Sequence, residues 1–217
     1  MLNISGKNRS NGDSVGLMTY FKKGHKEYFS ETFTDLKLVG QKINSLVFEE
    51  CSFNNCDFSD VSFVDCEFID CSFSKCNLSV VKLGHSRFHD VYFENCKVIG
   101  IDWTQADWPN IALFSPVKFF KCIMNHSTFF GLSLNEIVMK ECTAHDVDFR
   151  EGSFCKANFM FTDFANSLFK ETNLIEANFA EALNYRIDIN YNKIYRARFS
   201  RYEAVNLLES LEIELID

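Results

Sequence analysis

A five-residue repeat fills most of this chain and limits what it can fold into. Read in fives from Glu31, the sequence runs ETFTD, LKLVG, QKINS, LVFEE, CSFNN, CDFSD and onward to IALFS. The frame shifts by one residue at Pro116 and resumes as VKFFK, CIMNH and STFFG, ending with ANFAE. Phe holds the third position in 17 of the 30 repeats, and no repeat places a charge there. Because those 17 are drawn from only 24 phenylalanines, the frame reflects a structural unit rather than chance.

The first position of the repeat is small or apolar almost throughout, and only Glu31 is charged there, whereas positions two, four and five hold mostly Asp, Glu, Asn, Ser and Lys. Neither a straight strand nor a helix can bury a stripe with this period. Side chains five apart point to opposite faces of a strand, and in an α-helix they lie about 140° apart. One buried stripe at period five needs a bend in every repeat, so the chain must coil around its own core as a solenoid. Positions one and three then face inward.

The repeat resembles that of the pentapeptide repeat family, and CDFSD, CNLSV, ADWPN, ANFMF, TNLIE and ANFAE match its pattern best. The resemblance covers about residues 31–181. It implies an all-β fold, a right-handed quadrilateral parallel β-helix in which four pentads complete one coil. The cysteines support that coil length, since Cys56, Cys76 and Cys96 recur at every fourth pentad. Inward aromatic rings would then stack in columns along the rod.

Three regions are expected along the chain. Residues 1–30 form an N-terminal tail and cap, residues 31–181 the β-helix with its register slip near 115–116, and residues 182–217 a C-terminal cap. The tail is expected to be disordered to about residue 15. The N-terminal cap that follows is expected around Tyr20, Phe21, Tyr28 and Phe29.

The C-terminal region carries a capping box and an apolar stripe. Ser200 and Glu203 fit the S-x-x-E pattern, which predicts a helix over about 201–210, followed by a short strand over 212–216. In the simplest interpretation this segment folds over the last coil, because a solenoid must cover its terminal core. The family resemblance also implies that such segments pair two rods end to end, so a homodimer is expected. The cap and dimer residues are Val205, Leu207, Leu208, Leu211 and Ile213.

Cysteine spacing argues against a metal site. Zinc sites use clusters such as C-x2-C, whereas the thiols here follow C-x4-C, and eight of the nine fall at the inward first position. They are expected to be small apolar fillers, and disulfides between stacked thiols are conceivable but unneeded. Cys155 alone falls at an outward position. The start of the sequence has no secretory signal pattern, so reduced thiols and a cytoplasmic location are expected, with no metal and no cofactor.

Catalysis is not expected either. His85, His89, His126 and His145 fall at outward positions, with no nucleophile that the repeat would orient toward them. Outward carboxylates are plentiful but spread along the rod, whereas acid–base catalysis needs groups held together in a cleft. The sequence has no Gly-rich phosphate loop and no apolar stretch long enough to span a membrane. The chain is therefore interpreted as a binding protein and not an enzyme.

Charge is distributed unevenly. The formal net charge is −8, and the first thirty residues contribute +3, which leaves −11 for the remainder. This argues against direct nucleic-acid binding, which normally uses a basic face. The acidic surface is either an ordinary solvated surface, or a rod of regularly spaced carboxylates that imitates DNA and enters the DNA-binding groove of a protein. The proposed acidic face comprises Glu50, Asp60, Asp65, Asp70 and Asp90.

Resemblance within the family sharpens the second interpretation. The ending NKIYRARFSRYEAVNLLESLEIELID is similar to that of Qnr-type proteins and of immunity proteins against gyrase poisons such as microcin. It implies binding to a type II topoisomerase, DNA gyrase or topoisomerase IV, and protection from toxins or quinolones or modulation of their action. Qnr-type proteins project loops from the rod, whereas the only break expected here is the single-residue slip near Pro116.

A general protein-interaction scaffold is the alternative function. Several outward positions in the second half are apolar, and with four pentads per coil Phe120 and Met160 share one face two coils apart. A contiguous apolar patch would mark a partner site, whereas scattered residues would not. The candidate patch consists of Phe120, Phe130, Met160 and Phe161.

Overall fold

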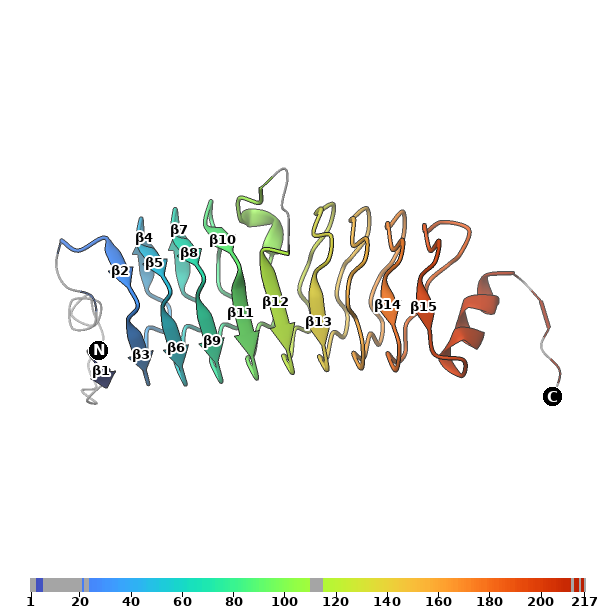
Figure 1. The fold of residues 1–217 in the computed structure, drawn as a ribbon, viewed down its shortest axis with the longest axis horizontal. Coiled ribbons are helices and arrows are strands. Elements are labelled where there is room, and N and C mark those ends of the chain that lie inside the picture. The colour runs from blue at the N-terminus through green and yellow to red at the C-terminus, as the bar shows by residue number, and fades with distance from the viewer. Residues whose placement is uncertain are drawn as a thin grey trace.

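The computed structural model is a rod of stacked coils (Figure 1). It describes residues 3–5, 21, 24–109, 115–211, 213–214 and 216. Short strands of successive coils pair in parallel with an offset of four pentads, as in Glu67 with Arg87 and Phe53 with Phe73. Four pentads therefore make one coil, which confirms the length that the family resemblance implies. The chain forms a right-handed, four-sided parallel β-solenoid of about eight turns.

We number the four sides of a coil in the order in which the chain follows them. Side 2 is held by single bridges, such as Lys37 with Asp57, and side 3 contains the 3₁₀ helix η1 (Trp103–Gln105). Side 1 contains β1 (Asn3–Ser5), β3 (Thr32–Thr34), β6 (Ser52–Asn54), β9 (Ser72–Ser74), β11 (Val91–Glu94), β12 (Val117–Phe120) and β13 (Val138–Lys140), and continues with β14 (Asn178–Phe179) and β15 (Arg198–Phe199). Side 3 also contains β4 (Lys42–Asn44) and β7 (Ser62–Val64), and side 4 contains β2 (Glu27–Phe29), β5 (Val47–Glu49), β8 (Glu67–Ile69) and β10 (Arg87–His89).

The chain turns at the fifth position of each pentad. Asp70, Val80 and other non-glycine residues adopt a left-handed conformation there, with φ between 51° and 61°. This conformation costs an L-residue about 1–2 kcal/mol. The turn is nevertheless repeated because its N–H donates to a carbonyl of the next coil, as Asp70 does to His89 O at 2.8 Å. Each turn therefore directs one side chain, most often a polar one, away from an edge of the rod.

Inward side chains form continuous columns. On side 1, Phe33, Phe53, Phe73 and Phe93 stack with successive centroid distances of 5.0, 4.6 and 4.9 Å and nearly parallel rings. First-position thiols fill the corners beside them, and the Cys76 thiol donates to Phe53 O at 3.3 Å. Such contacts give the thiols of the corners hydrogen-bond partners within the protein, as buried polar groups require.

One coil is longer than the others. Val91 pairs with Val117, which is six residues beyond the position that the regular coil length would give it. The pentad frame indicated only a one-residue slip, because the pentad IALFS also fits the repeat pattern. The pairing shows that this coil is six residues longer than the others, so the expected break was too short. In the sequence, the six extra residues lie between Trp108, whose ring stacks on Phe88 at 5.8 Å, and Val117.

Both ends of the solenoid extend beyond the predicted limits. Coil pairing begins at β2, which pairs with β5, and continues to β15, so the rod runs from Glu27 to Phe199. Strand β1 pairs with β3, although disorder was expected over these first residues. Phe21 packs on Tyr28 and covers the N-terminal end of the core, whereas Phe29 points outward. Tyr20 and most of the first fifteen residues lie outside the described residues.

The C-terminal helix η2 (Glu203–Leu211) is a 3₁₀ helix that begins two residues later than predicted. Of the expected strand over 212–216, the described residues 213, 214 and 216 are not in a strand. Across the part of the chain that the structure describes, no helix has the length and apolarity to cross a membrane.

Candidate functional site

Side 4 of the N-terminal half carries the densest group of carboxylates. Each strand there buries its central residue and turns the two that flank it outward, where they are exposed or half-buried. Parallel pairing then aligns the outward side chains of successive coils. The first column reads Glu27, Val47, Glu67 and Arg87, and the second reads Phe29, Glu49, Ile69 and His89. In the first three coils, carboxylates therefore alternate with apolar side chains both along each column and between the two columns, and Arg87 and His89 follow in the fourth coil.

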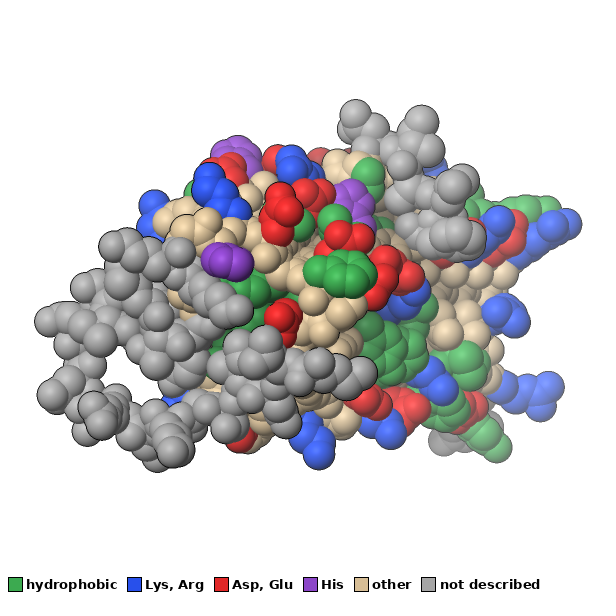
Figure 2. All heavy atoms as spheres, turned by 60° about the vertical axis from the view of Figure 1, so that its left-hand side comes forward, with side chains coloured by type: hydrophobic (Ala, Val, Ile, Leu, Met, Phe, Trp, Pro, Cys, Tyr) green, Lys and Arg blue, Asp and Glu red, His purple; other side chains and the backbone are tan. Residues whose placement is uncertain are grey.

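The edge between sides 4 and 1 continues the acidic surface. Glu50, Asp70 and Asp90 occupy its left-handed turns in three successive coils, about 4.8 Å apart along the rod. Ser30 donates to Glu50 at 2.8 Å, and Lys118 forms an ion pair with Asp90. We call Glu27, Glu49, Glu67, Glu50, Asp70 and Asp90 together the acidic side. Figure 2 shows acidic side chains interspersed with apolar ones over this part of the rod.

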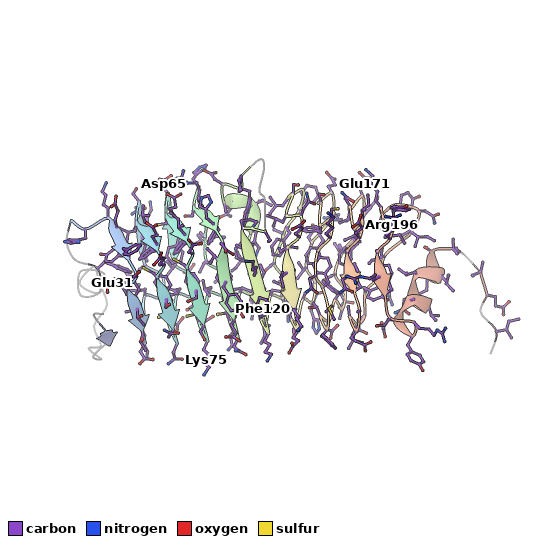
Figure 3. All side chains as sticks on the ribbon, in the orientation of Figure 1. Glu31, Asp65, Lys75, Phe120, Glu171 and Arg196 are labelled. Atoms are coloured by element: carbon purple, nitrogen blue, oxygen red, sulfur yellow. The ribbon has the colours of Figure 1, made fainter. Side chains whose placement is uncertain are left out.

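The structure brings four of the five predicted acidic residues to the borders of side 4. Glu50, Asp70 and Asp90 lie on one border, and Asp65 lies on the opposite one, between sides 3 and 4 (Figure 3). Asp60 does not join them, because it lies on the edge between sides 2 and 3, where Lys82 contacts it at 3.2 Å.

The sequence also contained a signal for Glu27 that the predicted boundary excluded. The pentad KEYFS directly precedes Glu31 and fits the repeat, with Tyr28 at the inward third position. Starting the solenoid one pentad earlier would have placed Glu27 on side 4.

Net charge falls almost entirely on the N-terminal half. Over residues 24–109 there are 14 carboxylates and 7 Lys or Arg, whereas over residues 115–211 there are 12 and 11. The acidic half spans four coil rises, or about 19 Å, which gives one net negative charge per about 3 Å of rod. Duplex DNA carries one per about 1.7 Å. The acidic half therefore has roughly half the linear charge density of DNA.

Among the described residues of side 4 in the acidic half, ion pairs reduce this charge at Glu67 alone. The Arg87 guanidinium lies 3.3 Å from Glu67, and His89 Nε2 lies 3.3 Å from the other oxygen of the same carboxylate. Because these side chains remain exposed to solvent, such pairs contribute little to stability. Glu27 and Glu49, nearer the N-terminal end, form no ion pair within the described residues.

Each histidine of the rod lies beside a carboxylate. The distances are 3.3 Å for His85 with Asp107, 3.9 Å for His126 with Asp146 and 2.9 Å for His145 with Asp163. Within the described ranges, no hydroxyl or thiol bonds to these rings and no three potential metal ligands gather. Each of these histidines therefore contacts a carboxylate of an adjacent coil.

The predicted apolar patch is divided between two sides of the rod. Phe120 lies on side 1, stacked on Tyr92 at 4.7 Å, and Lys140 separates it from Met160 in the same column. Phe161 occupies the next edge, with Lys140 Nζ 5.9 Å from its ring. Phe130 lies on the opposite side 3, beneath the Arg150 guanidinium at 5.7 Å. These four residues do not form one contiguous surface.

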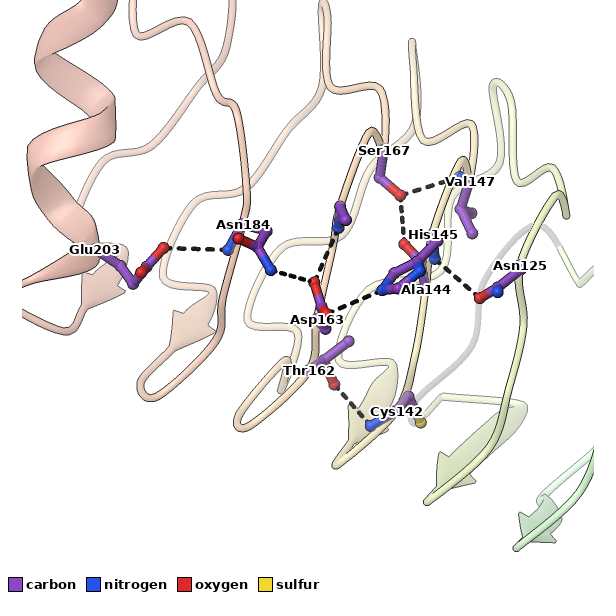
Figure 4. Close-up of polar contacts among 11 residues, drawn as sticks. Asn125, Cys142, Ala144, His145, Val147, Thr162, Asp163, Ser167, Asn184 and Glu203 are labelled. Atoms are coloured by element: carbon purple, nitrogen blue, oxygen red, sulfur yellow. Dashed lines mark hydrogen bonds and ion pairs between the residues drawn. The ribbon is translucent and has the colours of Figure 1, made fainter.

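The predicted capping box is not formed, because both of its side chains bind the last coil instead. Ser200 Oγ accepts from Glu181 N at 2.7 Å and donates to the Glu181 carboxylate at 2.9 Å. Glu203 accepts from Asn184 N at 3.1 Å, and Asn184 in turn donates to Asp163 (Figure 4). The polar contacts thus attach η2 to the rod.

The apolar residues of the C-terminal segment divide into two groups. Leu207 packs against the core of the last coil, and Leu208 is half-buried. Val205, Leu211 and Ile213 are exposed. The inner group covers the end of the solenoid, and the outer group leaves an apolar surface at the end of the rod.

Eight of the nine thiols are buried, and Cys155 is half-exposed on side 4. Burial raises the pKa of the Cys66 thiol above its ordinary value. The neighbouring Cys142 thiol, together with burial, raises the pKa of Cys122 to about 12. The thiolate is the reactive form of cysteine, so the raised pKa values of Cys66 and Cys122 disfavour reaction at these two thiols at neutral pH.

These features define a β-solenoid built from five-residue repeats, with an acidic side and a capped C-terminal end. The family model for the pentapeptide repeat region matches residues 46–114 and 110–179. The chain therefore belongs to the pentapeptide repeat family, whose solenoid is known as a non-catalytic fold.

Several solved structures are similar to this chain, and one form of QnrB1 shares its fold. A trypsin-treated form of QnrB1, a plasmid-mediated fluoroquinolone resistance protein, is 19% identical, with 85% of this chain and 100% of that chain covered and a TM-score of 0.56. Full-length QnrB1 is 16% identical over 86% and 100%, with a TM-score of 0.47. HetL from Nostoc sp. strain PCC 7120, involved in heterocyst differentiation regulation, is 10% identical over 81% and 90%, with a TM-score of 0.32. No curated protein sequence matches this chain.

Proposed function

We propose that this protein binds a type II topoisomerase, DNA gyrase or topoisomerase IV, in the place of DNA. It thereby protects the enzyme from quinolones or peptide toxins, or modulates their action, in the cytoplasm. The acidic side carries this proposal, because it presents six carboxylates at coil spacing on one face and edge of a rigid rod. The shared fold with a fluoroquinolone resistance protein supports the choice of partner, since quinolones act on these enzymes.

The charge density explains how such a rod would compete with DNA. A cationic groove attracts the acidic half over a distance of about one Debye length, roughly 8–10 Å at physiological salt, and steers it into place. Because the rod has about half the charge density of DNA, charge alone would leave it the weaker ligand. Phe29 and Ile69 lie exposed or half-buried among the carboxylates and offer apolar contacts that a DNA backbone lacks.

A supercoiling assay with purified gyrase tests the proposal, with and without a quinolone or peptide poison. The wild-type rod should inhibit or protect the enzyme. The triple variant Glu50→Lys, Asp70→Lys, Asp90→Lys should bind at least about tenfold more weakly at about 0.1 M salt, and the difference should shrink as salt rises.

The matched control is the triple variant Glu136→Lys, Glu151→Lys, Glu176→Lys. These carboxylates also occupy exposed left-handed turns, and their reversal changes the net charge equally, but they lie in the nearly neutral half. The control should bind as the wild type does. Equal losses in both variants would overturn the assignment to the acidic side, and no binding by the wild type would overturn the partner.

We also propose that two rods pair end to end through η2, with Val205, Leu211 and Ile213 at the contact. These side chains are exposed at the end of the rod, whereas a cap alone needs only the inner group that contains Leu207. Light scattering should give twice the chain mass for the wild type and the monomer mass for Val205→Asp with Leu211→Asp. A monomeric wild type at micromolar concentration would exclude the dimer.

The alternative function, a scaffold that uses an apolar patch, receives less support. Phe130 and Phe120 lie on opposite sides of the rod, and lysine separates Phe120 from Met160. One partner could not cover these residues together.

A further inference from the structure

The last coil reverses the charge of the rod. From residue 186 to residue 201 the chain has five Lys or Arg and a single carboxylate, Asp188. Asp188 is itself engaged, because it accepts from Asn190 N at 2.8 Å. Four of the five cations follow one another around the coil, and all four are exposed. We call them the basic belt: Lys193, Arg196, Arg198 and Arg201.

The belt occupies adjoining sides and edges of the rod. Lys193 pairs with Asn173 on side 4, and Arg198 in β15 pairs with Asn178 on side 1. Arg196 occupies the left-handed turn between them, with φ of 56° (Figure 3). Arg201 follows at the next edge. The four positive charges therefore point outward over one continuous half of the coil.

Carboxylates do not neutralise the belt. Throughout the described residues, none of its four side chains lies within ion-pair distance of Asp or Glu, although Lys82, Lys118 and Arg150 elsewhere do. One coil earlier, the amides Asn173 and Asn178 lie beside Lys193 and Arg198. Glu176 occupies the turn before Arg196 on the same edge, and the described residues contain no ion pair between the two. Glu181 lies nearby, but its carboxylate accepts a hydrogen bond from Ser200.

Exposed tyrosines accompany these charges. Tyr191, Tyr195 and Tyr202 are 60%, 65% and 90% exposed, whereas Tyr28 and Tyr185 are buried in the core. The Arg196 guanidinium lies 5.1 Å from the centre of the Tyr195 ring. Three of the seven tyrosines of the chain thus lie on the surface within twelve residues of one another, at the belt.

This combination matches the needs of single-stranded nucleic acid. A strand offers phosphates, which guanidinium groups bind with paired hydrogen bonds, and unpaired bases, which stack on exposed aromatic rings. An acidic peptide would use the charges but leave the ring faces without a planar partner. A duplex would also bind the charges, but its bases are already stacked.

The net negative charge of the chain does not oppose binding at the belt. Asp90 is the member of the acidic side closest to Arg196 along the rod, and five coils separate them. At about 4.8 Å per coil this is about 24 Å, more than twice the Debye length of about 10 Å at 0.1 M salt. The charge of the acidic side is therefore largely screened at the belt.

We propose that the basic belt binds single-stranded nucleic acid across the C-terminal coil, with Tyr195 and Tyr202 as stacking surfaces for its bases. The strand crosses the rod at this end, because the acidic half repels it elsewhere. This inference goes beyond the proposed function and does not rest on it. Its test contains no topoisomerase, so the two proposals fail separately.

Fluorescence anisotropy with a labelled 20-nucleotide thymidine oligomer and the full chain tests the proposal. Four phosphate contacts predict a slope of about −2.8 for log K against log salt, so affinity should fall about 50-fold between 50 and 200 mM salt. Arg196→Glu with Arg198→Glu should weaken binding at least tenfold and reduce the slope to about −1.4. Tyr195→Ser with Tyr202→Ser should weaken it at least fivefold and leave the slope unchanged.

The matched control is Lys37→Glu with Lys75→Glu, which changes the net charge equally at exposed positions of the acidic half. It should bind the oligomer as the wild type does, and all variants should melt within a few degrees of it. Equal losses in the belt and control variants, or no binding at the lower salt concentration, would overturn the proposal. So would a preference for duplex DNA, or equal competition by polyglutamate of the same charge, because either would make the tyrosines irrelevant.

Discussion

At the scale of single residues, the inward phenylalanines depend on their neighbours in the column. The Phe68 ring lies between Phe48 at 5.3 Å and Phe88 at 5.4 Å, nearly parallel to both. The backbone around it is held by hydrogen bonds to the coils before and after, such as Glu67 N to Leu46 O at 2.9 Å. Neighbouring rings therefore cannot move together to fill a gap, which makes a cavity in the column costly.

We predict that Phe68→Ala destabilises the rod by about 3–5 kcal/mol, as expected for a large side chain removed from a rigid core. Urea denaturation followed by circular dichroism measures this. Phe29→Ala is the control, because Phe29 is outward on the same side and 62% exposed, and it should cost less than about 1 kcal/mol. Similar losses for the two variants would contradict the inward column.

Buried thiols with raised pKa values make the folded rod less stable at alkaline pH. An unfolded thiol ionises with a pKa near about 8.5, but in the folded rod Cys122 has a pKa of about 12. Above about pH 8.5 the unfolded chain releases thiol protons that the folded chain keeps. The contribution of such a group is therefore complete below about pH 8.5 and declines as the pH rises toward about 12.

We predict that the free energy of unfolding falls between pH 7 and pH 10, by up to about 2 kcal/mol for each thiol of this kind. Denaturation under reducing conditions at both pH values measures the fall. Cys122→Ser should show a smaller one. Serine does not ionise here, and it already fills the equivalent corner at Ser127, where it donates to Val98 O at 2.9 Å. An identical fall in the variant would contradict this account.

At the scale of the element, Ser200 and Glu203 attach η2 to the rod, although the sequence predicted that they cap the helix. Glu203 accepts from Asn184 N at 3.1 Å and from the Asn206 side chain at 3.1 Å. Burial would raise the pKa of Asp163, but hydrogen bonds from Asn184 and His145 outweigh it and hold that pKa below its ordinary value. The contacts in Figure 4 therefore connect the helix to two further coils.

We predict that Glu203→Ala loosens the attachment of η2. The Asn184 N–H loses its acceptor, which is worth about 1–2 kcal/mol, so its amide should exchange with solvent roughly five- to thirtyfold faster. Hydrogen exchange measured by NMR tests this. Glu209→Ala is the control, because its carboxylate is exposed on the same helix. Unchanged exchange at Asn184 would show that the contact does not hold the helix.

The elements also show where sequence reasoning succeeds. The pentad frame predicted the solenoid, and the cysteines at every fourth pentad supported four sides, because the repeat itself encodes burial and turning. It placed Glu50, Asp70 and Asp90 on one edge for the same reason. It missed the longer coil because IALFS fits the pattern, and burial periodicity cannot tell whether a matching pentad pairs with its neighbours. The capping box predicted from Ser200 and Glu203 was wrong, because their hydrogen-bond partners lie nineteen residues earlier in the sequence.

At the scale of the whole molecule, the rod is electrically asymmetric. Its first half carries twice as many carboxylates as cations, its second half is nearly balanced, and its last coil is basic. Each coil contacts only its neighbours, so such differences can arise locally without disturbing the common core. The same independence means that whole segments can be removed if the offset between coils is preserved.

We predict that deleting residues 111–116 leaves a folded rod. The deletion joins ADWPN directly to VKFFK, so Phe93 and Phe119 remain in register while the coil shortens to the regular length of four pentads. Its melting temperature should stay within a few degrees of the wild type.

Deleting only residues 111–115 removes one pentad, yet it leaves the coil one residue too long. A strand offset by one residue turns its side chains to the other face, so this shorter deletion should be the more destabilising. Thermal melts of the two variants decide the point. If the six-residue deletion unfolds the rod, the extra residues are part of its framework and not an insertion between coils.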